Sequence, residues 1–179
     1  FKGINEEFSI DECTHSFFGV SKTYADLIVQ EYGKNVGLKT VSFRGGCITG
    51  PNHSGAKLHG FLSYLVKLSL TKKKYSLIGY KGKQVRDNLH SSDLVKCFDE
   101  FYKNPKAGEV YNIGGGNYSN CSMLEAIGIA EEVSSKKLNF KYIDEPRKGD
   151  HKWYVSDISK FENDYPNWKM SFNIENIIL

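Results

Sequence analysis

Apolar residues recur at helical spacing near the start of the chain. The residues with this spacing are Val20, Tyr24, Leu27, Ile28 and Tyr32. His15 and Ser16 are placed to begin this helix, and Gly37 follows its end. The pattern therefore predicts one helix over residues 17–34.

Strand and helix patterns alternate along the rest of the chain. Short apolar runs predict strands over residues 39–43, 75–78, 110–113 and 138–143. Amphipathic stretches predict helices over residues 58–70, 91–101, 122–133 and 156–161. This alternation indicates an α/β fold. The glycine-rich stretch 44–55 follows a strand, which is where α/β proteins bind ligands.

Composition narrows the class of protein. The chain has 179 residues and is 40% hydrophobic, enough for one well-buried domain or one domain plus part of a second, and this argues against disorder. The net charge is +3, and the densest basic run is residues 72–74. No aromatic residues interleave with this run, so we interpret it as a solvated loop and expect no nucleic-acid partner. No apolar run approaches the ~18 residues of a membrane span.

The four cysteines are widely separated and form no C-x-x-C pair: Cys13, Cys47, Cys97 and Cys121. This spacing suggests neither a zinc site nor a disulfide framework, and it favours a reducing, cytoplasmic setting. The chain begins with Phe1 and a polar stretch, so we expect it to start inside a longer protein.

Residues 16–22 read Ser-Phe-Phe-Gly-Val-Ser-Lys and resemble the Tyr-x-x-x-Lys helix of extended short-chain dehydrogenases/reductases. In that family the tyrosine exchanges a proton with a sugar hydroxyl while the nicotinamide takes a hydride from the same carbon. The lysine holds the nicotinamide ribose and lowers the pKa of the tyrosine. The resemblance therefore assigns Lys22 to cofactor binding and catalysis, with NAD as cofactor.

Phe18 occupies the position of the family tyrosine and has no titratable group. Three explanations are open: an inactivated site, a branch of the family that uses another base, or a mistaken alignment. Relatives with a similar Leu-Phe-Gly-Ala-Ser-Lys stretch favour the second. The candidate replacements are His15, Tyr24, Cys47 and Tyr80, although a structural role is the simpler interpretation of each.

Residues 79–93 resemble the Gly-x-Gly-x-Gln-x-Arg-Asp-x-x-His-x-x-Asp segment of sugar-nucleotide epimerases, dehydratases and decarboxylases. The resemblance implies that Arg86 contacts the diphosphate of a sugar nucleotide, a role that suits the planar fork of a guanidinium group. It implies structural roles for His90, at the entrance to the following helix, and for Asp93, in its first turn.

Two later segments extend the resemblance. Residues 110–116, Val-Tyr-Asn-Ile-Gly-Gly-Gly, lack the G-x-G-x-x-G spacing, so we interpret the glycines as a tight turn and not as a dinucleotide fingerprint. Residues 145–151 resemble a Pro-x-Arg-x-Gly-Asp segment, in which Arg147 would be a second contact to the nucleotide. We expect Arg86 and Arg147 to converge on one pocket.

The stretch 44–55 also resembles the substrate loop of these enzymes, with Cys47 at the position of a substrate-contacting asparagine. Thr49 and the continuation through Asn52 resemble the CDP-paratose 2-epimerase-like branch. Cys47, Thr49 and Asn52 are therefore predicted to bind substrate.

Together these motifs imply the C-terminal part of an NAD-dependent sugar-nucleotide epimerase, with a Rossmann-type fold. Residues 1–55 would be the remainder of the dinucleotide-binding domain. Residues 56–179 would be mainly the substrate domain, with some segments returning to the Rossmann sheet. The resemblance further implies a nucleotide-diphosphate sugar as ligand, a homodimer formed through helix 17–34, and no activity of this chain alone. The alternatives are a dehydratase or decarboxylase, or a non-catalytic sugar-nucleotide-binding protein that lost its tyrosine.

Overall fold

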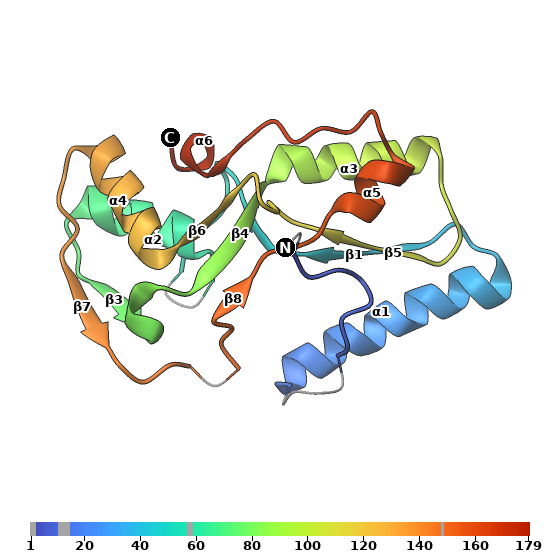
Figure 1. Cartoon of the computed structure of the whole chain (residues 1–179), viewed down its shortest axis with the longest axis horizontal. Helices are drawn as coiled ribbons and strands as arrows, with labels where there is room; N and C mark the ends of the chain where they lie inside the picture. Colours follow the sequence, from blue (N-terminus) through green and yellow to red (C-terminus); the bar gives the residue numbers. More distant parts are fainter. Residues whose placement is uncertain (1–2, 11–14, 57–58, 148) are drawn as a thin grey trace.

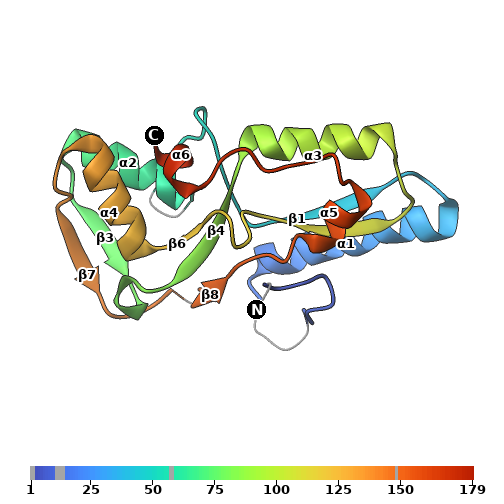
Figure 2. The same cartoon turned by 45° about the horizontal axis from the view of Figure 1, so that its top comes forward.

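Parallel strands β1 (Val41–Gly45) and β5 (Glu109–Ile113) form the centre of one half of the molecule. The computed structural model describes residues 3–10, 15–56, 59–147 and 149–179. Helix α1 (Phe17–Val36) lies on one side of the β1–β5 pair and helix α3 (Ser91–Lys103) on the other (Figures 1 and 2). Helix α5 (Ser159–Asp164) packs against β5.

Aromatic packing holds this half together. The ring of Phe43 in β1 lies 5.2 Å from that of Phe98 and 6.1 Å from that of Phe101, both in α3. It also lies 5.9 Å from the ring of Phe161 in α5. Phe101 and Phe161 are buried, and because burial of such large side chains favours folding, these two rings fix α3 and α5 on the strand pair.

The other half is a second hydrophobic core. Strand β3 (Tyr75–Ile78) pairs in parallel with β7 (Phe140–Ile143), and a 3-10 turn, η1 (Tyr80–Gly82), follows β3. Helices α2 (Phe61–Thr71), α4 (Met123–Ser134) and α6 (Ile174–Ile178) pack together beside this pair. Leu65 of α2 and Ala126 of α4 are completely buried in this core.

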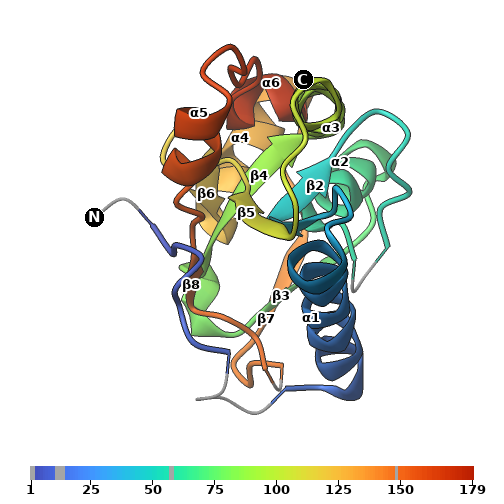
Figure 3. The same ribbon diagram turned by 90° about the vertical axis from the view of Figure 1, so that its right-hand side faces the viewer.

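Strand β4 (Val85–His90) connects the two halves. It pairs in parallel with β2 (Cys47–Thr49) and β8 (Trp153–Tyr154), and antiparallel with β6 (Asn120–Ser122). Figure 3 shows the N-terminal segment passing close to β8, where Ile4 forms a bridge to Ser156. Segments from both ends of the chain therefore meet beside β4.

Most predicted elements are present, with shifted ends. The 17–34 helix is α1, whose Ser16 side chain accepts from the Gly19 N–H at 3.1 Å and whose Gly37 ends the helix in the left-handed region. The helix predicted over residues 58–70 is α2, which begins only at Phe61, because His59 forms a bridge to Ala56 and Gly60 adopts φ 65°, outside the helical region. The helix expected at 156–161 is instead α5, Ser159–Asp164, because Ser156 is in extended backbone against Ile4 and Asp87.

Candidate functional site

A cavity of about 360 Å³ opens between strands β2, β3 and β4 and the start of α2. Its lining includes Cys47, Ile48, Thr49, His53, His59, Gly60, Phe61, Tyr75, Ser76, Ile78, Gln84, Arg86, Met123, Arg147 and Asp150. Strand β4 contributes Arg86, and Gln84 lies directly before this strand. The cavity therefore combines residues from the 44–55 loop with the two arginines predicted to converge.

Arg86 and Arg147 share one carboxylate. Asp150 Oδ1 lies 2.9 Å from Arg86 Nη2 and 3.5 Å from Arg147 Nη2. Arg86 also donates to the carbonyl oxygen of Val85 at 2.7 Å and to that of His151. These contacts hold two positive groups side by side at the wall of one cavity, as the sequence predicted.

The start of α2 adds further hydrogen-bond donors. Gly60 precedes the helix at φ 65°, and no side chain caps this end. Gly60 and Phe61 both line the cavity. Because the first N–H groups of a helix have no partner within it, an uncapped helix start that faces a cavity favours an anion there.

Cys47 and Thr49 lie in the cavity wall, but Asn52 does not. Burial, followed by the charge of Asp87, raises the pKa of the Cys47 thiol to about 11, so the thiol is neutral at physiological pH. Asn52 is exposed and lines a neighbouring hollow with Pro51 and Ser91. It lies in a turn at residues 51 and 52 and is not among the residues that line the cavity, so the structure does not bring it to the predicted pocket.

Lys22 and Phe18 lie together on α1. The Lys22 ammonium is 5.4 Å from the centre of the Phe18 ring, so the two side chains share a helix face. Phe18 is 68% exposed and is not part of a core. Lys22 lines a different hollow, beside Asp26 and Arg44, whose side chains form an ion pair at 2.6 Å.

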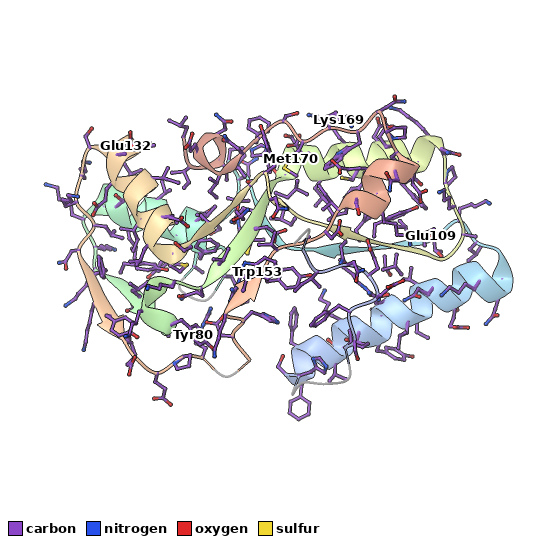
Figure 4. All side chains as sticks on the ribbon, viewed as in Figure 1. Tyr80, Glu109, Glu132, Trp153, Lys169 and Met170 are labelled. Carbon is purple, nitrogen blue, oxygen red and sulfur yellow. The ribbon has the colours of Figure 1, made fainter. Side chains whose placement is uncertain are left out.

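The candidate replacements for the missing tyrosine lie in different parts of the structure. The Tyr80 hydroxyl donates to the carbonyl oxygen of Asp150 at 3.1 Å, and Figure 4 shows Tyr80 at the edge of the molecule away from α1. Tyr24 is 66% exposed on α1, and His15 is bonded through Nε2 to the Ile10 carbonyl just before this helix. Of the four candidates, Cys47 alone is among the residues that line the arginine cavity.

His90 and Asp93 have the structural roles predicted for them. His90 Nδ1 accepts from the Ser92 N–H at 3.3 Å, which caps the start of α3, and its ring stacks on Phe172 at 4.2 Å. Asp93 is completely buried in the first turn of α3.

The triple glycine forms a close turn. A side chain at Gly115 would overlap the carbonyl oxygens of Ser119 and Asn88, which explains the need for glycine. The Gly116 N–H donates to Asp87 Oδ2 at 3.1 Å. Burial raises the pKa of Asp87, against hydrogen bonds from Ser156 and Gly116 that lower it.

Sequence reasoning missed several polar residues of the cavity, among them His53, His59 and Gln84. Gln84 was noted only as part of a motif, and the two histidines lie in a loop without periodicity. Arg86 lies in β4 and Gln84 directly before it, and β4 itself was not predicted, so no sequence pattern placed Gln84 in the cavity.

No described helix is both long and apolar enough to span a membrane. Within residues 3–10, 15–56, 59–147 and 149–179, no group of three or more histidine, cysteine or acidic side chains is arranged to hold a metal ion.

Comparison with known proteins identifies the family. The sequence model of the NAD dependent epimerase/dehydratase family matches residues 3–114. The chain belongs to this family. CDP-paratose 2-epimerase of Salmonella typhi is 29% identical over 167 residues, which cover 90% of this chain and 48% of that protein. dTDP-glucose 4,6-dehydratase of Salmonella typhimurium is 28% identical over 160 residues, covering 85% of this chain and 42% of that protein.

Solved structures confirm the predicted α/β, Rossmann-type fold. A dTDP-glucose 4,6-dehydratase from Bacillus anthracis, in complex with NAD, has a TM-score of 0.80 at 26% identity and covers 99% of this chain and 55% of that chain. A UDP-glucose 4-epimerase from Thermus thermophilus, also with NAD, has a TM-score of 0.81 at 20% identity, with 99% and 57% covered. The chain spans about half the length of the curated relatives it matches.

Proposed function

We propose that this chain binds a nucleotide-diphosphate sugar and forms the C-terminal part of an NAD-dependent epimerase. The observation that carries the proposal is the pairing of Arg86 and Arg147 on Asp150 inside one cavity. Membership of the epimerase/dehydratase family supports the same ligand class.

The charges and donors of the cavity suit a diphosphate. Arginine offers paired N–H donors in a fixed plane, which match phosphate oxygens and remain charged at any working pH. In the absence of ligand, Asp150 balances part of this charge. A diphosphate would take over hydrogen bonds that Asp150 now accepts, with the start of α2 supplying further backbone donors.

Lys22 is suited to holding NAD. Its ammonium lies on an exposed face of α1 and forms no ion pair with the described acidic residues, so it is available to donate to the ribose hydroxyls of the cofactor. NAD, when bound, supplies the acceptor and donor of a hydride. We place the cofactor contacts of this chain in residues 1–55 and the substrate contacts mainly in 56–179.

Epimerization is preferred over dehydration or decarboxylation because the continuation of the substrate loop through Asn52-His-Ser54 resembles the CDP-paratose 2-epimerase-like branch. The similarity to the Salmonella typhi CDP-paratose 2-epimerase supports this preference. The similarity to dTDP-glucose 4,6-dehydratases keeps a dehydratase as the alternative within the family.

Phe18 favours a second candidate, a sugar-nucleotide-binding protein without catalysis. A phenyl ring cannot exchange the proton that sugar oxidation requires. Phe18→Tyr in the intact protein with NAD bound tests this, with NADH absorbance as the readout and Phe18→Leu as control. A gain in sugar oxidation confined to Phe18→Tyr supports a dormant dehydrogenase site. Turnover by the protein with Phe18 in place contradicts the non-catalytic candidate.

Calorimetry with CDP, UDP and dTDP tests the binding site directly. We expect Arg86→Ala and Arg147→Ala each to weaken binding by about 1.5–3 kcal/mol, the contribution of a hydrogen bond to a charged group. Lys83→Ala is the control, because Lys83 is an exposed cation that does not line the cavity. Equal affinities of the arginine variants and Lys83→Ala would refute the proposal.

We also propose that the intact protein is a homodimer through α1. The support is the run of apolar side chains that α1 leaves exposed: Val20, Tyr24, Leu27, Ile28 and Tyr32. Contiguous exposed apolar surface of this kind marks an interaction site in soluble proteins.

A further inference from the structure

Asp87 lies where the chain passes between the two halves of the molecule. The Gly116 N–H, in the link from β5 to β6, donates to its Oδ2 at 3.1 Å. The Ser156 N–H, between β8 and α5, donates to the same oxygen at 2.9 Å. Gly46, which joins β1 to β2, packs on Oδ1 so closely that an added Cβ would lie 2.4 Å from it. One carboxyl group therefore contacts three separate links between the halves.

This carboxyl group has no positive partner. Asp87 is completely buried, and no described residue forms an ion pair with it. Its Oδ1 has no hydrogen-bond partner among the described residues, and the approach of Gly46 leaves no room for water on that side. Asp93 shows the contrast, because it is equally buried and accepts two backbone N–H bonds, but its other oxygen pairs with Lys96.

The arginines of the adjoining strands have other partners. Arg86, which precedes Asp87 in β4, forms its ion pair with Asp150 at the cavity wall. Neighbouring residues in a strand face opposite sides, so the Arg86 side chain leaves the strand away from Asp87. Arg44, in β1, pairs with Asp26. Neither arginine therefore compensates a charge on Asp87.

The titratable groups that face Asp87 are the thiol of Cys47 in β2 and the phenol of Tyr154 in β8. Burial, followed by the charge that Asp87 carries when ionised, raises the pKa of both groups. Both are therefore neutral at neutral pH, and the links at Gly46 and at residues 114–116 present only backbone. For Asp87 itself, burial outweighs the hydrogen bonds to the carboxyl group and raises the pKa.

We propose that Asp87 is a neutral carboxylic acid at neutral pH, with its proton on Oδ1, and that this proton locks the three links together. A buried carboxylate without a cation is costly, and protonation removes the charge while Oδ2 keeps its two N–H bonds. Loss of the proton leaves a negative charge among the links, which must then separate to admit water. The junction of the two halves is therefore sensitive to pH and loosens as the pH rises through the pKa of Asp87.

Urea unfolding at a series of pH values tests the protonation state. Because folding raises the pKa of Asp87, its stabilisation is fully present below the unfolded pKa of about 3.9 and is lost as the pH rises through the folded pKa. In Asp87→Asn the amide oxygen accepts the same two N–H bonds and nothing titrates. Relative to this variant, the folding equilibrium constant of the unchanged protein should fall by up to about tenfold per unit of pH between pH 5 and pH 7. Asp99→Asn, an exposed change on α3, should follow the unchanged protein throughout.

Carbon-13 NMR of the side-chain carboxyl groups, assigned through the backbone, observes Asp87 directly in the unchanged chain. We expect its signal to keep the chemical shift of a protonated acid through pH 7. A carboxyl group that titrates near the ordinary pKa of about 3.9 overturns the proposal. So does an Asp87→Asn protein that is less stable by the same factor at every pH, because Asp87 would then be an ionised acceptor with a merely structural role. The NMR titration needs no variant, so it decides the question even if Asp87→Asn does not fold.

Hydrogen exchange tests whether the proton locks the links. The amides of Gly116 and Ser156 should lose protection over the pH range in which Asp87 loses its proton. The amides of Ser171 and Phe172, which bond to a different buried carboxyl group, should keep theirs and serve as the control. In Asp87→Asn all four amides should stay protected. If Asp87 titrates while exchange at Gly116 and Ser156 follows the control amides, the lock is wrong.

Discussion

At Asp93, one buried carboxylate joins the start of α3 to the C-terminal segment. Its Oδ2 accepts from the backbone N–H of Ser171 at 2.8 Å and from that of Phe172 at 3.2 Å. Its Oδ1 forms an ion pair with Lys96 at 3.0 Å. The contacts span more than seventy residues, so this side chain stabilises the whole fold and not a local turn.

Asp93→Ala should lower the free energy of unfolding by about 2–4 kcal/mol, because it leaves two backbone N–H groups without acceptors. Urea denaturation measures this. The matched control is Asp99→Ala on the same helix, which breaks an exposed pair with Lys103 and should cost less than about 1 kcal/mol. Similar midpoints for the two variants would contradict the role given to Asp93.

Cys47 should be a slow nucleophile despite its place in the cavity wall. Burial and the neighbouring Asp87 raise its pKa to about 11, so the thiolate that reacts is scarce at neutral pH. Iodoacetamide labelling, read at residue 47 by mass spectrometry, should therefore be slow at pH 7–8 and should accelerate as the pH approaches 11. Rapid labelling at pH 7 would indicate that the thiol is not buried as described.

At the scale of elements, the packing around a glycine decides whether another residue can replace it. Gly115 lies where the backbones of Ser119 and Asn88 leave no room for a side chain. Gly128, inside α4, has no atom within 4 Å of an added Cβ. Glycine is therefore required at position 115, whereas position 128 has room for a side chain.

Gly115→Ala should destabilise the protein strongly, by more than about 2 kcal/mol, because the backbone must shift to relieve the overlap. Gly128→Ala should instead stabilise it, by up to about 1 kcal/mol, through the higher helix propensity of alanine. Thermal or urea unfolding of the two variants provides the comparison. If Gly115→Ala were instead more stable than the unchanged protein, the turn would have room for a side chain, and the role given to Gly115 would be wrong.

Strand β4 shows why some elements escaped prediction. Its residues Arg86, Asp87 and Asn88 are polar, so no apolar run or alternation marks it as a strand. Asp87 and Asn88 are nevertheless completely buried, because neighbouring strands and turns surround them. Long amphipathic elements such as α1 were predictable, whereas a central polar strand was not.

At the scale of the molecule, α1 leaves a run of apolar side chains exposed, and exposed apolar surface of this kind marks an interaction site. We expect the intact protein to be dimeric in light scattering, and Leu27→Glu to shift it toward monomer, since a buried charge opposes association. Lys34→Glu, an exposed change of charge on the same helix, should leave the dimer intact. A strict monomer with Leu27 unchanged would refute the homodimer.

By itself the sequence determined the α/β class, the presence of the long helices and the resemblance of residues 16–22, 79–93 and 145–151 to sugar-nucleotide enzymes. These features depend on local periodicity and on short motifs, which the order of residues contains directly. The tertiary structure alone decided which side chains share a cavity. It placed Arg86 and Arg147 on Asp150, brought His53 to the start of α2 and left Asn52 outside. Such proximity depends on how β4, α2 and the 147–150 segment pack together, because contacts between residues far apart in the chain are set by packing rather than by spacing along it.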